Sequence, residues 1–152
     1  MYYSGTQGQL FIDGVKAAKV RSWSFNSSLG LLDTTTLGDT DATSTPGIRT
    51  NTGSCSLFYY APVDEAVAPN SCSDLIRKLL KQQTSASEPG QAPETEKVTL
   101  RLTVTENTST TGVKHIEGDA YLTSVSMTCA VGEVLSADVA FQCDGAWKEV
   151  AL

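Results

Sequence analysis

The chain has 152 residues, with 11 Lys and Arg against 17 Asp and Glu, so its net charge is −6. That length fits one domain over residues 1–152, large enough to bury a core without disulfides or metals. The negative charge argues against nucleic-acid binding, which needs a clustered positive surface. No apolar stretch reaches the roughly 18 residues of a membrane helix, and the start lacks the pattern of a secretory signal.

The N-terminal region predicts a β-hairpin. Apolar and polar residues alternate over 9–13 and again over 15–28, which is the period of a half-buried strand. The dipeptide Asp13-Gly14 between them is typical of a tight hairpin turn. The second strand places Trp23 and Phe25 on one face and Ser side chains on the other.

Residues 33–48 predict a long loop. They are rich in Thr, Asp and Gly, a composition that buries little apolar surface. Long loops inside compact domains are usually functional or disordered. Asp33, Asp39 and Asp41 could offer oxygen ligands to calcium, but their spacing fits no known loop, and solvated carboxylates are the simpler interpretation. A strand is expected to follow from Gly53 to Tyr60.

One α-helix is predicted at about residues 71–83. Ser71 is a suitable N-cap, and Asp74 three residues later resembles a capping box. Apolar residues at helical spacing form one face, namely Leu75, Ile76, Leu79 and Leu80. We expect this helix to flank the strands and cover one side of the core.

After a polar loop at 84–96, the C-terminal half predicts further antiparallel strands. They lie at 97–106, 113–131 and 134–143, with a turn at Gly132-Glu133 before the last. The first is the most regular. Its expected inward residues are Val98, Leu100, Leu102 and Val104, and its expected outward residues are Thr99, Arg101, Thr103 and Thr105.

The four cysteines are interpreted as free thiols. They form no C-x-x-C pair, and with one histidine a zinc site is improbable. Cys129 and Cys143 alternate with apolar strand residues, as does Cys55, so all three are expected to be buried. Cys72 lies near the helix start and is expected to be more exposed and to react first with alkylating agents.

No motif for catalysis, a cofactor or a metal is present, so no enzyme is predicted. His115 beside Glu117 could form a proton-transfer pair, but a histidine on a strand surface is the simpler interpretation. Trp23 and Phe25 could form a platform for sugars, although core or interface packing explains them better. The sequons at Asn26 and Asn107 matter only in an exported protein.

Three blocks carry a resemblance to a known family. Residues 22–60 hold the run LDTTTLGDTDATSTPGIRT, and residues 121–145 read YLTSVSMTCAVGEVLSADVAFQCDG. Together with the opening hairpin GQLFIDGVKAAKVRSWSF, they resemble the major tail tube proteins of long-tailed bacteriophages. The resemblance is a pattern over most of the chain and is weakest over residues 61–119.

The resemblance implies a mainly β fold, a sandwich or rolled barrel of antiparallel strands with one flanking helix. It also implies a virion protein, assembled in the host cytoplasm, whose hexameric rings stack into the tail tube. DNA would pass through without specific binding, and tape measure, tail terminator and baseplate proteins would be partners. No cofactor and no membrane are implied.

Two groups of site residues follow. We expect Leu37, Asp39 and Asp41 in the 33–48 loop to contact the next ring. A lumen that lets DNA slide should be acidic, because a basic lumen would bind phosphates. The candidates for lumen-lining carboxylates are therefore Glu117, Asp119 and above all Asp138, and for Glu133 an ordinary turn position is the better interpretation.

Two alternatives remain open at this point. The chain could be a soluble β-sandwich module, for binding or capsid decoration, that stays monomeric. It could instead form the related Hcp-type rings of type VI secretion. Electron microscopy of the purified protein would separate the monomer from the tube.

Overall fold

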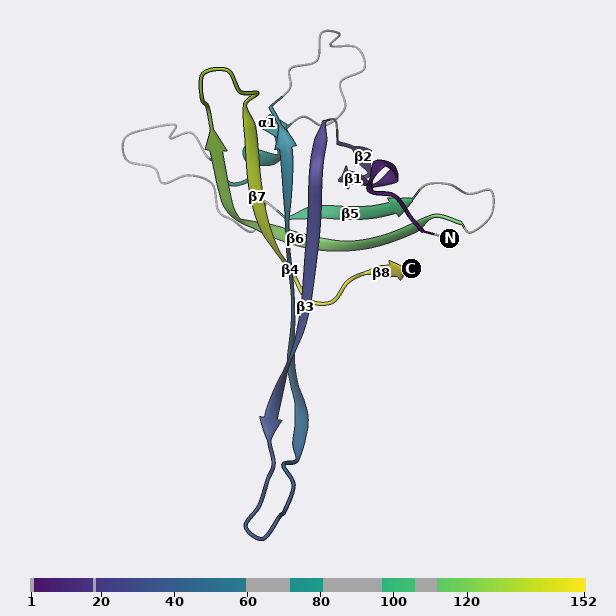
Figure 1. The fold of residues 1–152 in the computed structure, drawn as a ribbon, viewed down its shortest axis with the longest axis vertical. Helices are drawn as coiled ribbons and strands as arrows, with labels where there is room; N and C mark the ends of the chain where they lie inside the picture. Colours follow the sequence, from purple (N-terminus) through teal and green to yellow (C-terminus); the bar gives the residue numbers. More distant parts are fainter. Residues whose placement is uncertain (1, 18, 60–71, 81–96, 106–111) are drawn as a thin grey trace.

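The computed structural model describes residues 2–17, 19–59, 72–80, 97–105 and 112–152. It shows a body of strands from which one long two-stranded arm projects (Figure 1). The elements, in chain order, are the 3₁₀ turn η1 (Gly5–Gln7), β1 (Gln9–Ile12), β2 (Val15–Lys16), β3 (Val20–Asp33), β4 (Ser44–Phe58), α1 (Cys72–Ile76), β5 (Val98–Thr105), β6 (Lys114–Thr128), β7 (Ser136–Cys143) and β8 (Glu149–Ala151).

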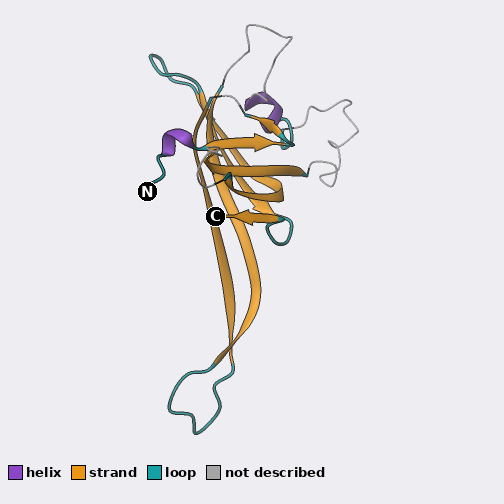
Figure 2. Ribbon diagram, turned by 90° about the vertical axis from the view of Figure 1, so that its right-hand side faces the viewer, coloured by secondary structure: helices purple, strands orange, loops and turns teal. Residues whose placement is uncertain are grey.

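The strands form one antiparallel sheet rather than the two sheets of a sandwich. Their order is β2-β1-β5-β6-β7-β4-β3, and β8 pairs with β6 outside this path. The mainly β fold expected from the sequence is thus confirmed, in its rolled form. Figure 2 shows the strands of the body wrapped around one another above the arm.

The sheet rolls because β6 is shared between two groups of strands. Its first half pairs with β5 up to Ala120, and its second half pairs with β7. The register shifts between Leu122 and Ser124, and such a bulge bends a strand and increases its twist. One core therefore collects buried side chains from several strands and α1, among them Leu10, Leu57, Leu100, Val139 and Phe141.

The opening hairpin is shorter than predicted. Asp13 and Gly14 both have positive φ, of 50° and 81°, as a tight two-residue hairpin turn requires. The turn is therefore confirmed. The predicted strand over 15–28 is divided, however, because β2 ends at Lys16 and β3 begins at Val20. Lys19, with φ of 58°, lies between them.

A loop is present where the sequence predicts it, but it is shorter than the predicted range of 33–48. β3 continues through Gly30 to Asp33, and β4 already begins at Ser44, so the connecting loop is limited to residues 34–43. The added strand segments form the arm seen in Figure 1. Pro46 pairs with Leu31 there, and a strand tolerates proline where the missing N–H would face solvent.

The predicted flanking helix at 71–83 is also not found at that length. α1 covers only Cys72–Ile76, and residues 77–80 form a turn and irregular chain. Leu75 and Ile76 are buried in the core as expected, whereas Leu79 and Leu80 are exposed. Ser71 and residues 81–83 lie outside the described residues. None of the described helices is long and apolar enough to cross a membrane.

The alternation predicted for 97–106 holds only in its first part. Val98, Leu100 and Leu102 are buried. The register then shifts between Thr103 and Thr105, and both threonines are buried as well. Their expected exposure is therefore wrong. The bulge places Thr105 on the buried side in place of Val104, whereas Thr103 precedes the bulge and is buried in regular register.

Two of the four cysteine predictions are wrong. Cys55 and Cys143 are buried as expected, but Cys129 is exposed and Cys72 is buried, and all four are free thiols. Burial raises the pKa of Cys55 to about 12 and that of Cys143 to about 11, and it raises the pKa of Cys72. Cys129 is exposed because it directly follows β6, in the connection that joins β6 to β7.

Native alkylation should therefore modify Cys129 first. The other three thiols are covered and form thiolate poorly, and the thiolate is the reactive species. Peptide mass spectrometry of dilute protein treated with iodoacetamide at pH 8 should show Cys129 labelled roughly tenfold faster or more than each of the others. Cys129→Ser should remove the fast phase. Early labelling of Cys72 would contradict this burial pattern.

Candidate functional site

The four strands β6, β7, β4 and β3 form a wall with two different faces. On one face, three rows of polar side chains cross the strands in register, formed by Ser22, Ser56, Asp138 and Ser126, by Ser24, Ser54, Ala140 and Ser124, and by Asn26, Thr52, Gln142 and Tyr121. Most of these residues are exposed. We call this surface the hydroxyl face.

The opposite face of the wall belongs to the core. Its rows contain Trp23 with Cys55 and Val139, and Phe25 with Gly53 and Phe141. A side chain at Gly53 would have no room, because an added Cβ would lie 2.5 Å from the Phe141 ring and 2.6 Å from the Ser24 carbonyl oxygen. The wall is thus a strand layer with hydroxyls on one side and aromatic packing on the other.

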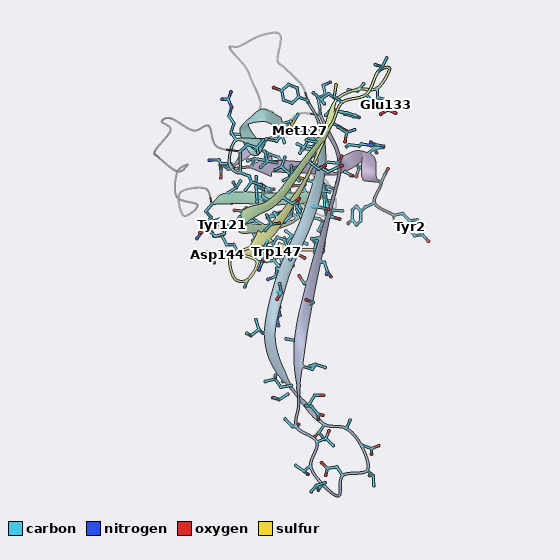
Figure 3. All side chains as sticks on the ribbon, turned by 90° about the vertical axis from the view of Figure 1, so that its left-hand side faces the viewer. Tyr2, Tyr121, Met127, Glu133, Asp144 and Trp147 are labelled. Atoms are coloured by element: carbon cyan, nitrogen blue, oxygen red, sulfur yellow. The ribbon has the colours of Figure 1, made fainter. Side chains whose placement is uncertain are left out.

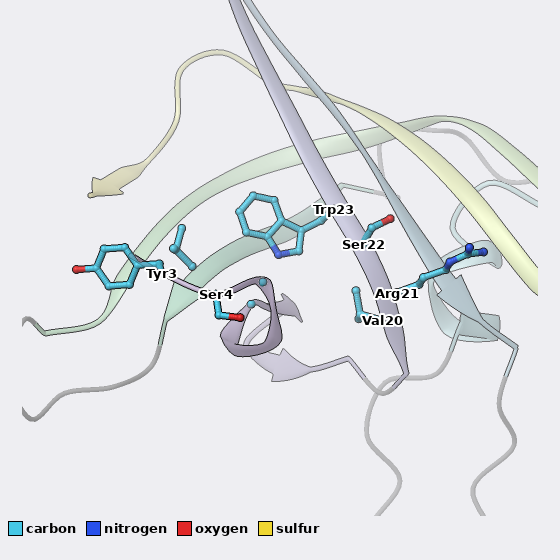
Figure 4. Close-up of a pocket in the computed structure, with 9 residues that line it drawn as sticks. Tyr3, Ser4, Val20, Arg21, Ser22 and Trp23 are labelled. Carbon is cyan, nitrogen blue, oxygen red and sulfur yellow. The ribbon is translucent and has the colours of Figure 1, made fainter. Parts of the chain in front are cut away.

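Asp138 is exposed on the hydroxyl face, as the sequence predicts. Of the residues in the three rows, Asp138 is the one that carries a formal charge. It borders a shallow depression of about 290 Å³ lined by serines of β3 and β4, where the Ser24 and Ser54 hydroxyls are 2.9 Å apart. Arg21 lies beside this face, because its side chain points to the same side of β3 as Ser22 (Figure 4).

The structure places Glu117 and Asp119 on the first half of β6, outside the three rows. The Asp119 carboxylate is 2.7 Å from Lys148 Nζ, and it accepts a hydrogen bond of 2.7 Å from the Thr99 hydroxyl. Lys148 and Thr99 hold the pKa of Asp119 below its usual value. Nearby, Lys97 Nζ lies 2.6 Å from Asp144. Lys148 and Lys97 thus form ion pairs with Asp119 and Asp144.

Asp119→Asn should cost less than about 1 kcal/mol of unfolding free energy at pH 7, as for other surface pairs. Because the folded pKa is lowered, this contribution is complete above the unfolded pKa of about 3.9 and is lost as the pH falls through the folded value. Urea unfolding at pH 7, 5 and 3 should show the difference shrinking. Asp41→Asn, at an exposed position, is the control, and a difference that grows on acidification would contradict the assignment.

His115 is buried, so its predicted position on a strand surface is wrong. It is 8% exposed, and its Nε2 lies 3.2 Å from a carboxylate oxygen of Glu149 on β8, the strand that pairs with β6 at this point. With Glu117, these residues form the one group in the described residues that could hold a metal, with ligand atoms within 4.8 Å of one another. The His115–Glu117 proximity follows from their alternation on β6, whereas β8 was not predicted.

The arm is fixed to the body by a hydrogen-bond network that the sequence does not reveal. Asn51, 3% exposed, donates to the Gly145 carbonyl oxygen at 2.9 Å and accepts from the Ser27 hydroxyl at 2.7 Å. The Trp147 indole donates to the same hydroxyl at 3.0 Å and packs edge-on against Phe25. Below Asn51 the arm has no further partner strand among the described residues (Figure 1).

The loop at the arm tip is shaped by its own hydrogen bonds. The Thr34 amide donates to the Thr43 carbonyl oxygen at 2.9 Å. The Asp39 carboxylate accepts from the Thr36 amide at 2.7 Å and hydroxyl at 2.9 Å, which holds the pKa of Asp39 below its usual value. Leu37 is fully exposed. Asp33 likewise accepts from the Thr35 amide, so these carboxylates cap the loop backbone.

The aromatic pair Trp23 and Phe25 lies on the core side of β3, with ring centroids 6.5 Å apart. Trp23 is half-buried and lines a cavity of about 410 Å³ together with Tyr3 and other residues of the N-terminal segment. Figure 4 shows Tyr3 and Trp23 on the same side of β3. Trp23 thus packs against the chain start and Phe25 packs against Trp147, so both belong to internal packing, as the sequence interpretation favoured.

Comparison with solved structures identifies the fold. A chain of the SPP1 tail tube superposes with a TM-score of 0.68 and 10% identity, covering 98% of this chain and 80% of that chain. A chain from the tail of the empty gene transfer agent particle, determined with C6 symmetry, has a TM-score of 0.61 and 14% identity, with 99% and 100% covered. A chain of the anti-feeding prophage cap has a TM-score of 0.64 and 13% identity, with 95% and 89% covered.

These neighbours share the fold at low sequence identity. No protein-family model matches the chain, and no curated protein matches it significantly. The chain therefore has the fold of phage tail tube chains and of the tube and cap chains of contractile injection systems. The neighbours come from tube and cap assemblies, and what this chain shares with them is the fold.

Proposed function

We propose that this chain is the subunit of a viral tail tube, in which six copies close into a ring and rings stack to form a conduit for DNA. The proposal rests on the wall formed by β6, β7, β4 and β3. It is a four-stranded layer with a continuous polar face and two strand edges that have no partner within the described residues. The shared fold with tail tube chains agrees with this use.

The two free edges fit one another. β3 pairs with β4 on one side only, and β6 beyond Ala120 pairs with β7 on one side only in the described residues. Because every neighbouring pair in the wall is antiparallel, β3 runs opposite to β6. A copy placed beside the first would therefore continue the antiparallel pattern. Exposed edges otherwise promote uncontrolled association, and closing the ring removes them.

Ring closure would turn the hydroxyl face into the lumen. The three rows of the hydroxyl face contain no Lys or Arg that could bind DNA phosphates, and Arg21 lies at their border. A negative lumen repels the backbone over about 8 Å at physiological salt. Six copies, the symmetry of the gene transfer agent tail, would place six Asp138 carboxylates in each ring. In a virion tail, tape measure, terminator and baseplate proteins would bind the tube and its ends.

The proposal is tested with the purified protein. Size-exclusion chromatography over a hundredfold concentration range and negative-stain microscopy should show rings or tubes of constant width as concentration rises. A protein that stays monomeric at all concentrations would overturn the proposal and favour a β-sandwich binding module. Rings that never stack would favour a secretion-type ring.

Asp138→Lys should slow genome ejection and leave the tubes intact. Its side chain is exposed and takes no part in the core, so assembly should survive, whereas six added cations per ring would bind phosphates and retard DNA. Ejection rates of assembled particles, measured by DNA release, should fall several-fold. Glu117→Lys tests whether the lumen extends over the first half of β6, and Glu133→Lys at the hairpin turn is the control. Normal ejection through intact Asp138→Lys tubes would contradict the lumen assignment.

A further inference from the structure

The body has an apolar groove at the end opposite the arm. It lies between α1 and the β6–β7 hairpin, encloses about 460 Å³ and is lined by Tyr59, Ile76, Arg77, Leu80, Met127 and Leu135. Tyr59, Leu80 and Met127 are at least two-fifths exposed. Figure 1 places α1 and this hairpin at the upper end and the arm at the lower end, and Figure 3 places Met127 and Glu133 far from the arm tip.

The arm tip is apolar and acidic. Leu37 is fully exposed, and Leu31 and Leu32 next to the loop are more than half exposed. The loop at 34–43 contains Asp39 and Asp41 and no basic residue. Asp39 is engaged by Thr36, whereas no hydrogen bond or ion pair of Asp41 occurs within the described residues.

The groove is apolar and basic, so the two surfaces are complementary. Arg77 is exposed at its rim, and Lys78 follows it in the chain. Exposed apolar side chains of this kind mark interaction sites when polar residues border them. Complementary surfaces at opposite ends of one molecule generate open, repeating assemblies, because each copy binds the next in the same way.

We propose that the arm tip of one copy docks in the groove between α1 and the β6–β7 hairpin of a copy in the adjacent ring. Leu37 enters the groove among Leu80, Met127 and Leu135, and Asp41 pairs with Arg77. The inference rests on the stacking of rings proposed above and adds the surface that receives the arm. A second copy is the occupant because its tip supplies both the apolar side chain and the opposite charge.

A charge exchange tests the docking. Asp41→Lys and Arg77→Glu should each raise the protein concentration needed for tube assembly about tenfold, since each places like charges together. The double variant restores opposite charges and should assemble within about threefold of the parent protein. Lys16→Glu, the same charge change on exposed β2, should have no effect. Light scattering and microscopy measure assembly, and circular dichroism confirms that each variant is folded.

A second measurement does not depend on charge. In a Cys129→Ser background, Leu37→Cys combined with Leu80→Cys should give covalent ladders of subunits when assembled tubes are treated with a short bismaleimide. Each single cysteine should give none. If the parent protein forms tubes and Arg77→Glu assembles equally well, the docking is wrong and the tube proposal stands. The same follows if the double-cysteine variant forms tubes but gives no ladders. A parent protein that never forms tubes would overturn both.

Discussion

Replacing residues 35–42 with Asn-Gly is expected to leave a folded subunit that forms no tubes. Thr34 and Thr43 are already joined by a backbone hydrogen bond, and Asn-Gly suits a two-residue hairpin between them. The removed residues are exposed, so the core loses nothing. Assembly should fail even at ten times the concentration at which the parent protein forms tubes, because the arm loses Leu37 and Asp41.

The control for this deletion keeps the loop length and removes only the apolar side chain. Leu37→Ser should weaken assembly less than the deletion does, and both variants should unfold at the same urea concentration as the parent protein. Deletion variants that form normal tubes would show that the arm tip takes no part in stacking. Deletion variants that unfold more easily would show that the loop supports the arm itself.

Gly53→Ala is expected to be the most damaging small substitution in the wall. The added methyl group would overlap the Phe141 ring at 2.5 Å and the Ser24 carbonyl oxygen at 2.6 Å. The second contact is backbone of a neighbouring strand and cannot rotate away. Overpacking of this kind costs about 1–3 kcal/mol and sometimes more, so we expect a loss of about 3 kcal/mol in the free energy of unfolding.

Urea unfolding of three variants tests this packing. Gly5→Ala is the matched control, because nothing lies within 4 Å of a Cβ there, and it should stay within about 0.5 kcal/mol of the parent protein. Adding Phe141→Leu to Gly53→Ala should cost less than the sum of the two single changes, because the smaller side chain relieves one overlap. Additive costs would show that Phe141 and position 53 do not share this space.

The local alternation of the strands was predictable from the sequence. Over 22–25, 98–102 and 136–143, the residues that alternate in the sequence lie on alternate faces of their strands in the structure, as predicted. The Asp13-Gly14 turn and the exposed position of Asp138 were likewise predictable. These features depend on a residue and its near neighbours, because backbone pleating and turn geometry are local.

Which segments cover each face depends on long-range packing and could not be predicted from the sequence. Cys72 is buried and Cys129 exposed because burial depends on which distant segment packs there. His115 pairs with Ala151 of β8, a strand that is too short to show a period. The Asn51 contact to Gly145 and the Trp147 contact to Ser27 join residues far apart in the chain. The arm was missed because two strands that pair only with each other face solvent on both sides, so no apolar alternation marks them.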